Sequence, residues 1–365
     1  MPDGTADILI VGAGIAGASL ACELGTSASV VLLEAEEQPG YHATGRSAAF
    51  FLESYGNETI RALTRASRGF FEHPPDGFCD APLLTPQDCI FVAASGDLDE
   101  LRAQYEQMRE VSDSVSVEST EFALERVPVL RPAYAAGCLW ERGAQRIDVH
   151  ALLSGYLKRF RSAGGRLVTG AQVTHARREG KTWHVESTAG EFRARVIVNA
   201  AGAWADAIAE LAGAAPRGLQ VLKRTACLIE TEPVVEPAGW AAVTDVRESF
   251  YFMPEAGQLL LSPADETPVP AGDAYPDDLD VAIAVDRFEA ATTLSVRRVS
   301  HQWAGLRTFA PDRSPVVGFD AGVDGFFWLA GQGGYGIQTA PALSRQAGKL
   351  LQQAPLTAES GSARR

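Results

Sequence analysis

The sequence predicts a protein of the mixed α/β (α+β) class, in which a domain built on a parallel sheet is interleaved with a second domain built on an antiparallel β-sheet. Three observations predict it. A glycine-rich strand–helix–strand pattern begins at residue 7. Buried strands of the same type recur far along the chain, the last being RVIVN at Arg195–Asn199. Between residues 217 and 262, several runs alternate apolar and polar residues, as strands of an antiparallel sheet do.

The first predicted element is a βαβ unit. DILIV, at Asp7–Val11, is a short apolar run rich in branched residues, which is typical of a buried parallel strand. GAGIAG, at Gly12–Gly17, matches the pattern GxGxxG, and a helix is expected to follow as far as Leu24. SVVLL, at Ser29–Leu33, forms the next strand, which ends at the acidic residue Glu34.

This spacing indicates a dinucleotide site. Gly12 makes the tight turn, Gly14 lets the backbone approach a pyrophosphate, and Gly17 lets the helix pack closely on the strand. The helix N-terminus offers unpaired N–H groups and partial positive charge to the phosphates. Glu34 stands where it can accept hydrogen bonds from a ribose hydroxyl pair. The alternative is an ordinary glycine-rich turn between a strand and a helix.

The following elements return to this first domain after a long interruption. A helical pattern starts at Asp148, ends at Gly164 and Gly165, and has one apolar face formed by Leu152, Leu153, Tyr156 and Phe160. Strands are then predicted at Arg166–Thr169, Gln172–Arg177, Trp183–Ser187 and Arg195–Asn199.

The second domain is expected from different material. Prolines punctuate residues 55–140, and strands are predicted within LKRTACLIE, WAAVTDV, SFYFMP and QLLLSP. Pro276–Arg297 is predicted to be one long helix. The first domain is therefore expected to comprise residues 1–54, 145–216 and 305–355, and the second domain residues 55–144 and 217–304. The tail, residues 356–365, is expected to be disordered.

Composition and charge argue against several classes of protein. The 365 residues are 46% apolar and 21% charged, as in a globular protein, and the net charge of -14 argues against a nucleic-acid surface. No apolar run has the length of a membrane span, and the acidic start MPDGTAD is unlike a signal peptide. Five scattered cysteines suit reduced thiols, and six histidines without HExxH or HxH spacing predict no metal site. A cytoplasmic location is therefore expected.

Two further loops indicate which dinucleotide is bound and carry a resemblance to a known family. GYHATGRSAA follows the ribose acid and is rich in small residues and donors, and GQGGYGIQT precedes a helix whose N-terminus suits an anionic ring edge. With VIVNAAGAWAD and GLRTFAPDRSPVVG, these segments resemble the FAD-dependent D-amino-acid oxidase and sarcosine oxidase superfamily over almost the whole chain. PPDGFCDAPLL and ESFYFMPEAG make it look most similar to the bacterial D-arginine dehydrogenases.

The resemblance implies a Rossmann-like domain with tightly bound FAD and oxidation of an amine carbon. It places the adenosine ribose at Glu34 and the adenine at Val173. Some relatives tether the flavin to a cysteine near the C-terminus, but no cysteine follows Cys227, so FAD is expected to be non-covalent. The cofactor-binding residues expected in this way are Gly12, Gly14, Ile15, Ala16, Gly17, Glu34, Ala35, Thr44, Gly45, Arg46, Ser47, Ala48, Val173, Ala200, Gly202, Trp204, Gly333, Gly334, Tyr335, Gly336, Ile337 and Gln338.

One arginine, Arg307, stands among apolar and aromatic neighbours in QWAGLRTFAP. The resemblance implies that it clamps a substrate carboxylate together with Arg224 and Tyr251, because a planar guanidinium matches a carboxylate bidentately. The residues alone leave another interpretation open, in which both arginines pair with protein acids such as Asp312 or Asp245.

Other residues take supporting roles by the same resemblance. Tyr55, Gln338 and Gly334 border the substrate, and the first two order water around the amine, although Tyr55 could equally be a core residue. His42 is expected to serve the cofactor loop or the surface rather than act as a base. Lys223, beside Arg224, should point to the opposite face of its strand.

The expected substrate pocket differs from that of the D-arginine dehydrogenases at three positions. By the resemblance, Cys89 replaces an acid that meets a basic side chain, Phe50 replaces a histidine and Leu52 replaces a threonine. These changes predict a preference for neutral or apolar D-amino acids over basic ones. Asp88 should point to the other strand face, and Glu53 is a second acid that could compensate. Incidental packing is the alternative explanation of all three positions.

The implied reaction is hydride transfer from the α-carbon of a neutral amine to flavin N5, which gives an imino acid that hydrolyses to a 2-oxo acid and ammonia. The electron acceptor stays open between oxygen, a quinone and a carrier protein, with a preference for dehydrogenase chemistry. Two alternatives are kept: oxidation of a secondary, N-methyl or cyclic amino acid, and a non-catalytic FAD-binding protein. A flavin hydroxylase is disfavoured because no GD signature follows RTFAPDRSPVVG.

Overall fold

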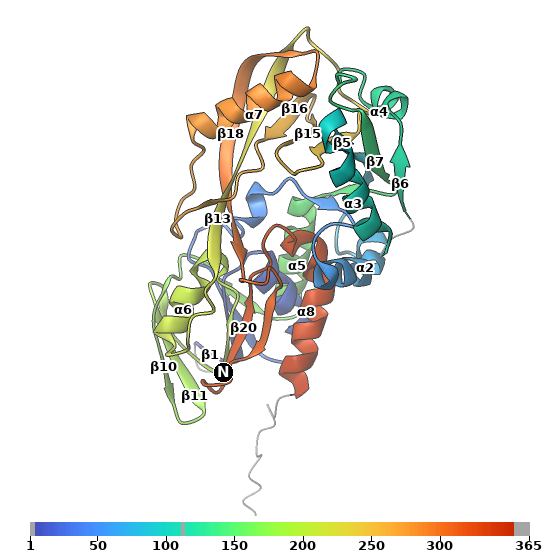
Figure 1. The fold of residues 1–365 in the computed structure, drawn as a ribbon. Helices are drawn as coiled ribbons and strands as arrows, with labels where there is room; N and C mark the ends of the chain where they lie inside the picture. Colours follow the sequence, from blue (N-terminus) through green and yellow to red (C-terminus); the bar gives the residue numbers. More distant parts are fainter. Residues whose placement is uncertain (1–3, 111–113, 354–365) are drawn as a thin grey trace, which may run out of the picture.

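The computed structural model describes residues 4–110 and 114–353 and contains two large β-sheets, one above the other in Figure 1. The lower sheet has the order β10-β11-β12-β1-β2-β9, and β20 and β19 extend it beside β12. Strands β1, β2, β9, β12 and β20 run parallel, and β10, β11 and β19 are antiparallel to their neighbours. The strands are β1 Thr5–Val11, β2 Val30–Leu33, β9 Arg166–Val168, β10 Val173–Glu179, β11 Thr182–Ser187, β12 Gly190–Asn199, β19 Val316–Phe319 and β20 Phe326–Ala330.

Strand β1 is buried on both faces, which explains its continuous run of apolar residues. Ile8 and Ile10 pack into the core formed with helices α1 Ile15–Leu24, α5 Val149–Ser162 and α8 Gly336–Gln353. Leu9, between them, faces the opposite core, which contains Trp183 and Trp328. The further elements of this part of the molecule are helix α6 Ala205–Leu211 and the short 3-10 turns η1 Thr44–Arg46 and η3 Gly202–Trp204.

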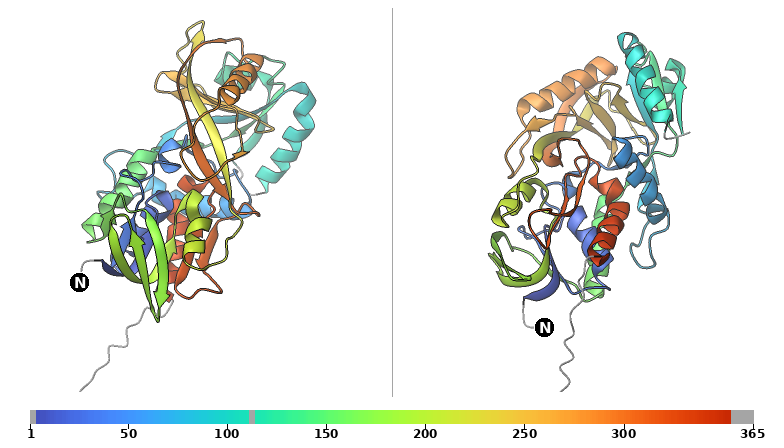
Figure 2. Two further views of the ribbon diagram at one scale, coloured as in Figure 1. Left: turned by 90° about the vertical axis from the view of Figure 1, so that its left-hand side faces the viewer. Right: turned by 60° about the horizontal axis from the view of Figure 1, so that its bottom comes forward.

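The upper sheet is mainly antiparallel and has the order β17-β13-β16-β15-β14-β5-β7-β6, with β18 on the other side of β13. Its long strands β13 and β18 run from the upper sheet down to the lower one, as Figures 1 and 2 show. The elements are β5 Cys89–Ala93, β6 Val115–Glu118, β7 Gly137–Glu141, β13 Gln220–Glu232, β14 Ala242–Asp245, β15 Tyr251–Glu255, β16 Gln258–Ser262, β17 Thr267–Pro268, β18 Ser295–Phe309, η2 Ser95–Asp97, α3 Leu98–Arg109, α4 Thr120–Arg126 and α7 Asp278–Ala291.

A third, small sheet contributes side chains to two of the hydrophobic cores, Phe51 to one and Phe50 to another. It pairs β8 Gln145–Ile147 with β3 Phe50–Phe51 on one side and with β4 Leu84–Pro86 on the other. Helix α2 Glu58–Glu72 follows β3 and packs against α8. This sheet fixes the start of the segment that carries Leu52 and Tyr55, two of the residues expected at the substrate.

The structure confirms the mixed α/β class, the initial βαβ unit and the helix from Asp148, whose side chain caps α5 by accepting from Ala151 N–H. The prediction of one helix over Pro276–Arg297 is wrong. Helix α7 ends at Ala291, Thr292 is already extended with φ -123° and ψ 168°, and β18 starts at Ser295. The β-branched residues after Ala291 favour a strand, and the ladder between β18 and β13 holds it there.

The predicted disorder of residues 356–365 concerns positions outside the described residues. Within the described part of the chain, no helix has both the length and the apolar character needed to cross a membrane. The domain boundaries expected from the sequence stay a prediction.

Candidate active site

A cavity of about 530 Å³ lies between the two large sheets and is bordered by both. It extends from Glu34, at the end of β2, to Cys89, at the start of β5. Its walls come from the N-terminus of α1, the 3-10 turn η1, strands β13, β15 and β18, and the loop before α8. This volume lies within the range of small-molecule sites in proteins.

The three glycines of GAGIAG form one end of the cavity. Gly12 has φ +100°, and a Cβ atom there would lie 2.4 Å from the carbonyl oxygen of Ala200. A Cβ atom on Gly17 would lie 1.9 Å from the carbonyl oxygen of Gly12, so this glycine serves the close packing of helix on turn. Gly14 caps α1 without a side-chain hydrogen bond, and Ile15 N–H donates to Thr44 Oγ1 at 3.0 Å. The helix N-terminus therefore faces the cavity, where an anion would meet its N–H groups.

Glu34 borders the same end of the cavity. Its carboxylate accepts from the backbone N–H of Ala13 at 2.8 Å and of Glu36 at 3.1 Å. Burial raises the pKa of Glu34, and these backbone donors offset part of that shift. Val173 lines the cavity as well. A half-buried acceptor near an apolar side chain suits a ribose and its base.

Gln338 borders the other part of the cavity and has one polar atom left over. Its Oε1 accepts from Leu52 N–H at 3.1 Å, and only 3% of the residue is exposed. Its Nε2 is buried and has no hydrogen-bond partner among the residues that the structure describes. Because buried donors are nearly always paired, this N–H group points to an acceptor carried by a bound molecule.

Arg307, on β18, lies in the cavity wall directly against Gly334. A Cβ atom on Gly334 would lie 2.8 Å from Arg307 Nη1 and 3.0 Å from Cζ, so only glycine leaves the guanidinium its present position. Burial lowers the pKa of Arg307, but the phenols of Tyr55, Tyr251 and Tyr335 and the carboxylate of Glu266 raise it, and the net shift is upward. Within residues 4–110 and 114–353, no carboxylate forms an ion pair with this guanidinium.

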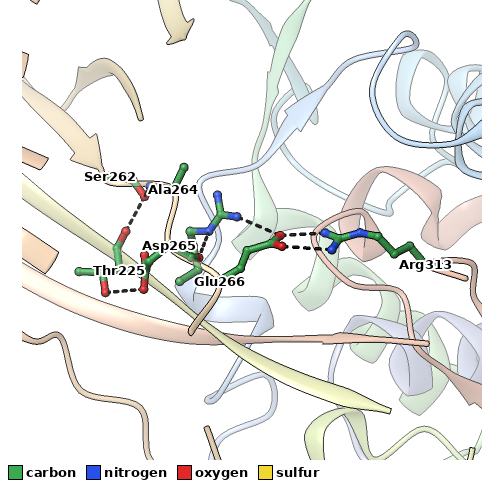
Figure 3. Close-up of polar contacts among 7 residues, drawn as sticks. Thr225, Ser262, Ala264, Asp265, Glu266 and Arg313 are labelled. Carbon is green, nitrogen blue, oxygen red and sulfur yellow. Dashed lines mark hydrogen bonds and ion pairs between the residues drawn. The ribbon is translucent and has the colours of Figure 1, made fainter. Parts of the chain in front are cut away.

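Arg224, on β13, also faces the cavity but already has protein partners, Asp265 and Glu266, which are labelled in Figure 3. Its Nε donates to the carbonyl oxygen of Asp265 at 2.9 Å, and its Nη2 lies 3.4 Å from Glu266 Oε1. Glu266 in turn takes two hydrogen bonds from Arg313, at 2.8 and 3.1 Å. One carboxylate thus serves two arginines, and Arg224 is its more distant partner.

The alternative interpretation, in which the arginines pair with protein acids, applies to Arg224 within the described residues, but with an acid other than the two named. Asp245 accepts from Tyr134 O–H and Arg247 N–H, and Asp312 accepts from Ser314 N–H. Neither acid pairs with Arg224 or Arg307, and the acid that does bind Arg224 is Glu266, 42 residues away. Lys223 points away from the cavity, as expected, and forms ion pairs with Asp277 and Asp280.

Comparison with known proteins identifies the family of this chain. Residues 7–350 match the family described as FAD dependent oxidoreductase, DAO. The chain belongs to this family of FAD-dependent oxidoreductases. Its curated relatives include mouse (Mus musculus) dimethylglycine dehydrogenase, which is 26% identical over 369 residues covering 91% of this chain and 40% of that protein. The chain therefore spans about two fifths of the length of that relative.

Two solved structures show the fold that this oxidoreductase shares. Glycine oxidase from Geobacillus kaustophilus superposes with a TM-score of 0.83 and 23% identity, over 97% of this chain and 98% of that one. L-proline dehydrogenase from P. horikoshii also has a TM-score of 0.83, with 19% identity over 95% of this chain and 93% of that one.

The cavity of this oxidoreductase fits FAD. The helix N-terminus suits the diphosphate, Glu34 suits the ribose, and the unpaired Nε2 of Gln338 suits a carbonyl oxygen on the flavin ring. Most residues expected to bind the cofactor line this cavity: Gly12, Gly14, Ile15, Ala16, Glu34, Ala35, Thr44, Arg46, Ser47, Ala48, Val173, Ala200, Gly202, Trp204, Gly333, Gly334, Gly336, Ile337 and Gln338.

Three expected cofactor residues lie behind the wall of the cavity rather than in it. Gly17 packs on the turn, and Gly45 N–H closes the loop by donating to the carbonyl oxygen of Gly40 at 2.7 Å. Tyr335 places its ring 5.0 Å from that of Tyr55. His42 lines the cavity and lies 2.8 Å from a carboxylate oxygen of Glu36, which suits the expected role in the cofactor loop.

All the residues expected at the substrate border the cavity: Arg224, Tyr251, Arg307, Tyr55, Gln338, Phe50, Leu52, Cys89 and Gly334. The two acids considered as substitutes for a charge at position 89 do not. Asp88 pairs with Arg126 at 3.2 Å, and Glu53 pairs with Arg68 at 2.9 Å. Cys89 is 2% exposed, and burial raises the pKa of its thiol, so it contributes an uncharged side chain to the cavity wall.

Several lining residues are absent from the expectations. Phe91 and Met253 add to the apolar wall near Cys89. Phe91 could have been predicted from the sequence, because it lies two residues after Cys89 on the same strand face. Glu248 could not have been predicted, because it lies in the turn after β14, with φ +52°, and no periodic pattern includes it. Burial raises the pKa of Glu248, while Arg224 and Arg307 lower it in part.

Proposed function

We propose that this oxidoreductase oxidises the bond between the α-carbon and nitrogen of a D-amino acid, and that it prefers neutral or apolar side chains to basic ones. The product is an imino acid, which water converts to a 2-oxo acid and ammonia. The observation that carries the proposal is Arg307, a cavity-lining guanidinium that forms no ion pair with a carboxylate of the described chain. A substrate carboxylate supplies the missing partner.

The surroundings of Arg307 support a carboxylate clamp. The phenols of Tyr55 and Tyr251 line the same cavity, and burial raises the pKa of Tyr55, so its hydroxyl stays protonated and can donate. Arg224 adds positive charge nearby, since Glu266 divides its own charge between Arg224 and Arg313. A carboxylate held between these groups would gain charge-assisted hydrogen bonds.

FAD, when bound, supplies the chemistry by accepting a hydride at N5. The residues of the chain need only hold the substrate so that its α-carbon faces that position with the amine neutral. The clamp on the carboxylate sets the orientation of the substrate, and Gln338 is proposed to border the amine. No nucleophile is required, which agrees with the buried and neutral state of Cys89.

The side-chain end of the cavity supports the specificity. Phe50, Leu52, Cys89, Phe91 and Met253 form an apolar wall. A cationic side chain placed there would lose its hydration without gaining a partner. A neutral apolar side chain would instead gain about 25 cal/mol for each Å² of surface that it buries.

A second candidate is oxidation of a secondary, N-methyl or cyclic amino acid. The names of the relatives favour it, since they include a dimethylglycine dehydrogenase and an L-proline dehydrogenase. The carboxylate clamp would be the same in both cases. The products differ: ammonia from a primary amine, and methylamine or a cyclic imine from the others.

An anaerobic screen of D-, L-, N-methyl and cyclic amino acids, followed by flavin absorbance, tests the proposal. We expect neutral D-amino acids to bleach the flavin and to release ammonia. Bleaching by N-methyl or cyclic amino acids alone would establish the second candidate. A flavin that stays oxidised with every compound would instead indicate a non-catalytic FAD-binding protein.

A further inference from the structure

The segment from Leu52 to Gly56 is attached to the rest of the molecule on both sides of Tyr55. Leu52 N–H donates to Gln338 Oε1 at 3.1 Å, and Arg61 Nε donates to the carbonyl oxygen of Gly56 at 2.7 Å. Tyr55 itself makes one backbone hydrogen bond within the segment, to the carbonyl oxygen of Leu52 at 3.4 Å. The position of the Tyr55 ring in the cavity wall therefore depends on these attachments of its neighbours, together with its contact with the ring of Tyr335.

The strongest of these attachments is made by Ser54 to a buried acid, Glu141. Ser54 N–H donates to Glu141 Oε1 at 3.2 Å, and the Ser54 hydroxyl donates to Glu141 Oε2. Glu141 and Ser54 are each 2% exposed. Glu141 is the last residue of β7, which places it 87 residues from Ser54 in sequence. Hydrogen bonds to a carboxyl group in such a dry place are strong, and an unpaired partner there is costly.

Glu141 does not line the cavity, but it is paired with a residue that does. In the ladder between β5 and β7, Glu141 stands opposite Cys89, which lines the cavity. Side chains of directly opposite residues project from the same face of a sheet, so Glu141 lies beside Cys89. The acid therefore reaches Ser54 next to the apolar wall, and it is not among the residues that border the substrate cavity.

We propose that Glu141 is a positioning residue: it holds Ser54 and thereby fixes the hydroxyl of Tyr55 against the carboxylate of the bound substrate. This inference rests on the proposed function, because it assigns Tyr55 to the carboxylate clamp. The bond between Glu53 and Arg68 in the same segment does not have this role, since Arg68 is 36% exposed and solvent screens the pair.

Two substitutions of Glu141 separate its geometry from its charge. In Glu141→Gln, Oε1 still accepts from Ser54 N–H, and the amide can donate to the Ser54 hydroxyl oxygen, so the attachment is kept. In Glu141→Ala, both bonds are lost. Arg68→Ala is the matched control, because it removes a screened bond to the same segment. Ser54→Ala, which removes the hydroxyl bond alone, decides the question if Glu141→Ala does not fold.

The first measurement is amide hydrogen exchange of the holoenzyme. We expect Glu141→Ala or Ser54→Ala to speed exchange in residues 52–56, with Glu141→Gln and Arg68→Ala close to the unmodified protein. The second is the Kd of benzoate, a simple carboxylate, from its effect on the flavin spectrum. We expect Kd and KM to rise roughly 10- to 100-fold in Glu141→Ala, with a smaller change in kcat.

The inference is overturned if exchange in residues 52–56 is unchanged in folded Glu141→Ala, or if it accelerates throughout β5 and β7 with no change in the Kd of benzoate. Equal losses in Glu141→Gln and Glu141→Ala would also overturn it, since the charge and not the attachment would then matter. If the unmodified protein neither binds benzoate nor oxidises any amino acid, the proposed function fails, and hydrogen exchange still shows whether Glu141 holds the segment.

Discussion

At the scale of single residues, Arg307 and Arg224 are alike in sequence context but differ in their partners. Arg307 is free of ion pairs with the described carboxylates and lies under Gly334, whereas Arg224 is held by Asp265 and Glu266. Binding of a carboxylate to Arg224 must therefore compete with Glu266, and binding to Arg307 does not. Their contributions to catalysis should differ accordingly.

We expect Arg307→Ala to lower kcat/KM by an amount equivalent to roughly 2–5 kcal/mol, because the substrate carboxylate would then be buried without its main partner. Arg224→Ala should cost less. Arg307→Lys should not restore activity, since an ammonium cannot bind a carboxylate bidentately. Arg298→Ala, an exposed arginine on the same strand, is the control. Near-normal turnover by Arg307→Ala with FAD retained would disprove the clamp.

Gly334→Ala should weaken substrate binding without disturbing the fold. The added methyl group would lie 2.8 Å from Arg307 Nη1, so the guanidinium has to move, while the backbone at this position is not in the left-handed region. We expect KM to rise more than kcat falls. Gly69→Ala in α2 is the matched control, since nothing lies within 4 Å of its added carbon and alanine favours a helix. Unchanged KM would show that the guanidinium has room.

Cys89→Glu is expected to shift the preference towards D-arginine and D-lysine, which we measure as the ratio of kcat/KM for basic and neutral D-amino acids. The structure adds a complication, because the new carboxylate would stand opposite the buried Glu141. Two buried carboxyl groups so close disfavour ionisation of both. The larger shift should therefore appear in the double variant Cys89→Glu/Glu141→Gln. D-arginine as the best substrate of the unmodified protein would contradict this account of the pocket.

At the scale of elements, the site depends on how strand ends and turns meet. The β5–β7 ladder sets Glu141 beside Cys89, and the turn after β14 brings Glu248 to the cavity. Of these two acids, Glu141 is the one withdrawn from solvent, and burial raises its pKa, with the hydrogen bonds from Ser54 offsetting part of the shift. Its protonation therefore affects the stability of the fold.

The sign of this effect gives a prediction. An acid whose pKa is raised in the folded state stabilises the fold fully below its unfolded pKa, roughly 4.3, and this contribution is lost as pH rises through the folded pKa. Glu141→Gln cannot ionise, so its Tm should improve relative to the unmodified protein as the pH rises from about 4 towards neutral. Parallel Tm curves for the two proteins would show that the pKa of Glu141 is not raised.

At the scale of the whole molecule, the long strands β13 and β18 join the two sheets and bring Arg224 and Arg307 to the cavity between them. Elements of both sheets form the walls of the cavity. The cavity is therefore complete only when both sheets are formed. A cofactor bound in it contacts residues from Gly12 to Gln338 and should stabilise the entire fold.

We expect the purified protein to be yellow and to release intact FAD on denaturation. No cysteine follows Cys227, which is itself fully buried on β13 and not in the cavity wall. Added FAD should raise the Tm of the apoprotein. At a free FAD concentration one hundred times Kd, binding adds about 2.7 kcal/mol to the free energy of unfolding. Flavin that remains with the polypeptide after acid precipitation would disprove the non-covalent attachment.

Local sequence determined the parts of this protein whose physics is local. The spacing of Gly12, Gly14 and Gly17 between two apolar strands is sufficient to form a βα turn with a helix N-terminus that suits a phosphate, and the acid after the second strand completes the motif. The capped helix from Asp148 and the alternating strands also follow from local sequence. The similarity to D-arginine dehydrogenases, drawn from longer motifs, stays a prediction, as do the roles of individual residues.

Tertiary structure alone decided the pairings between distant residues. Glu266 binds Arg224 and Arg313, Glu141 binds Ser54, and β18 begins where sequence periodicity suggested that a helix continues. Each of these depends on segments that are between roughly 40 and 90 residues apart in the chain, and on which polar groups are withdrawn from water when the sheets pack. Periodicity reports the face on which a side chain lies, whereas its partner is fixed only when another element is packed against that face.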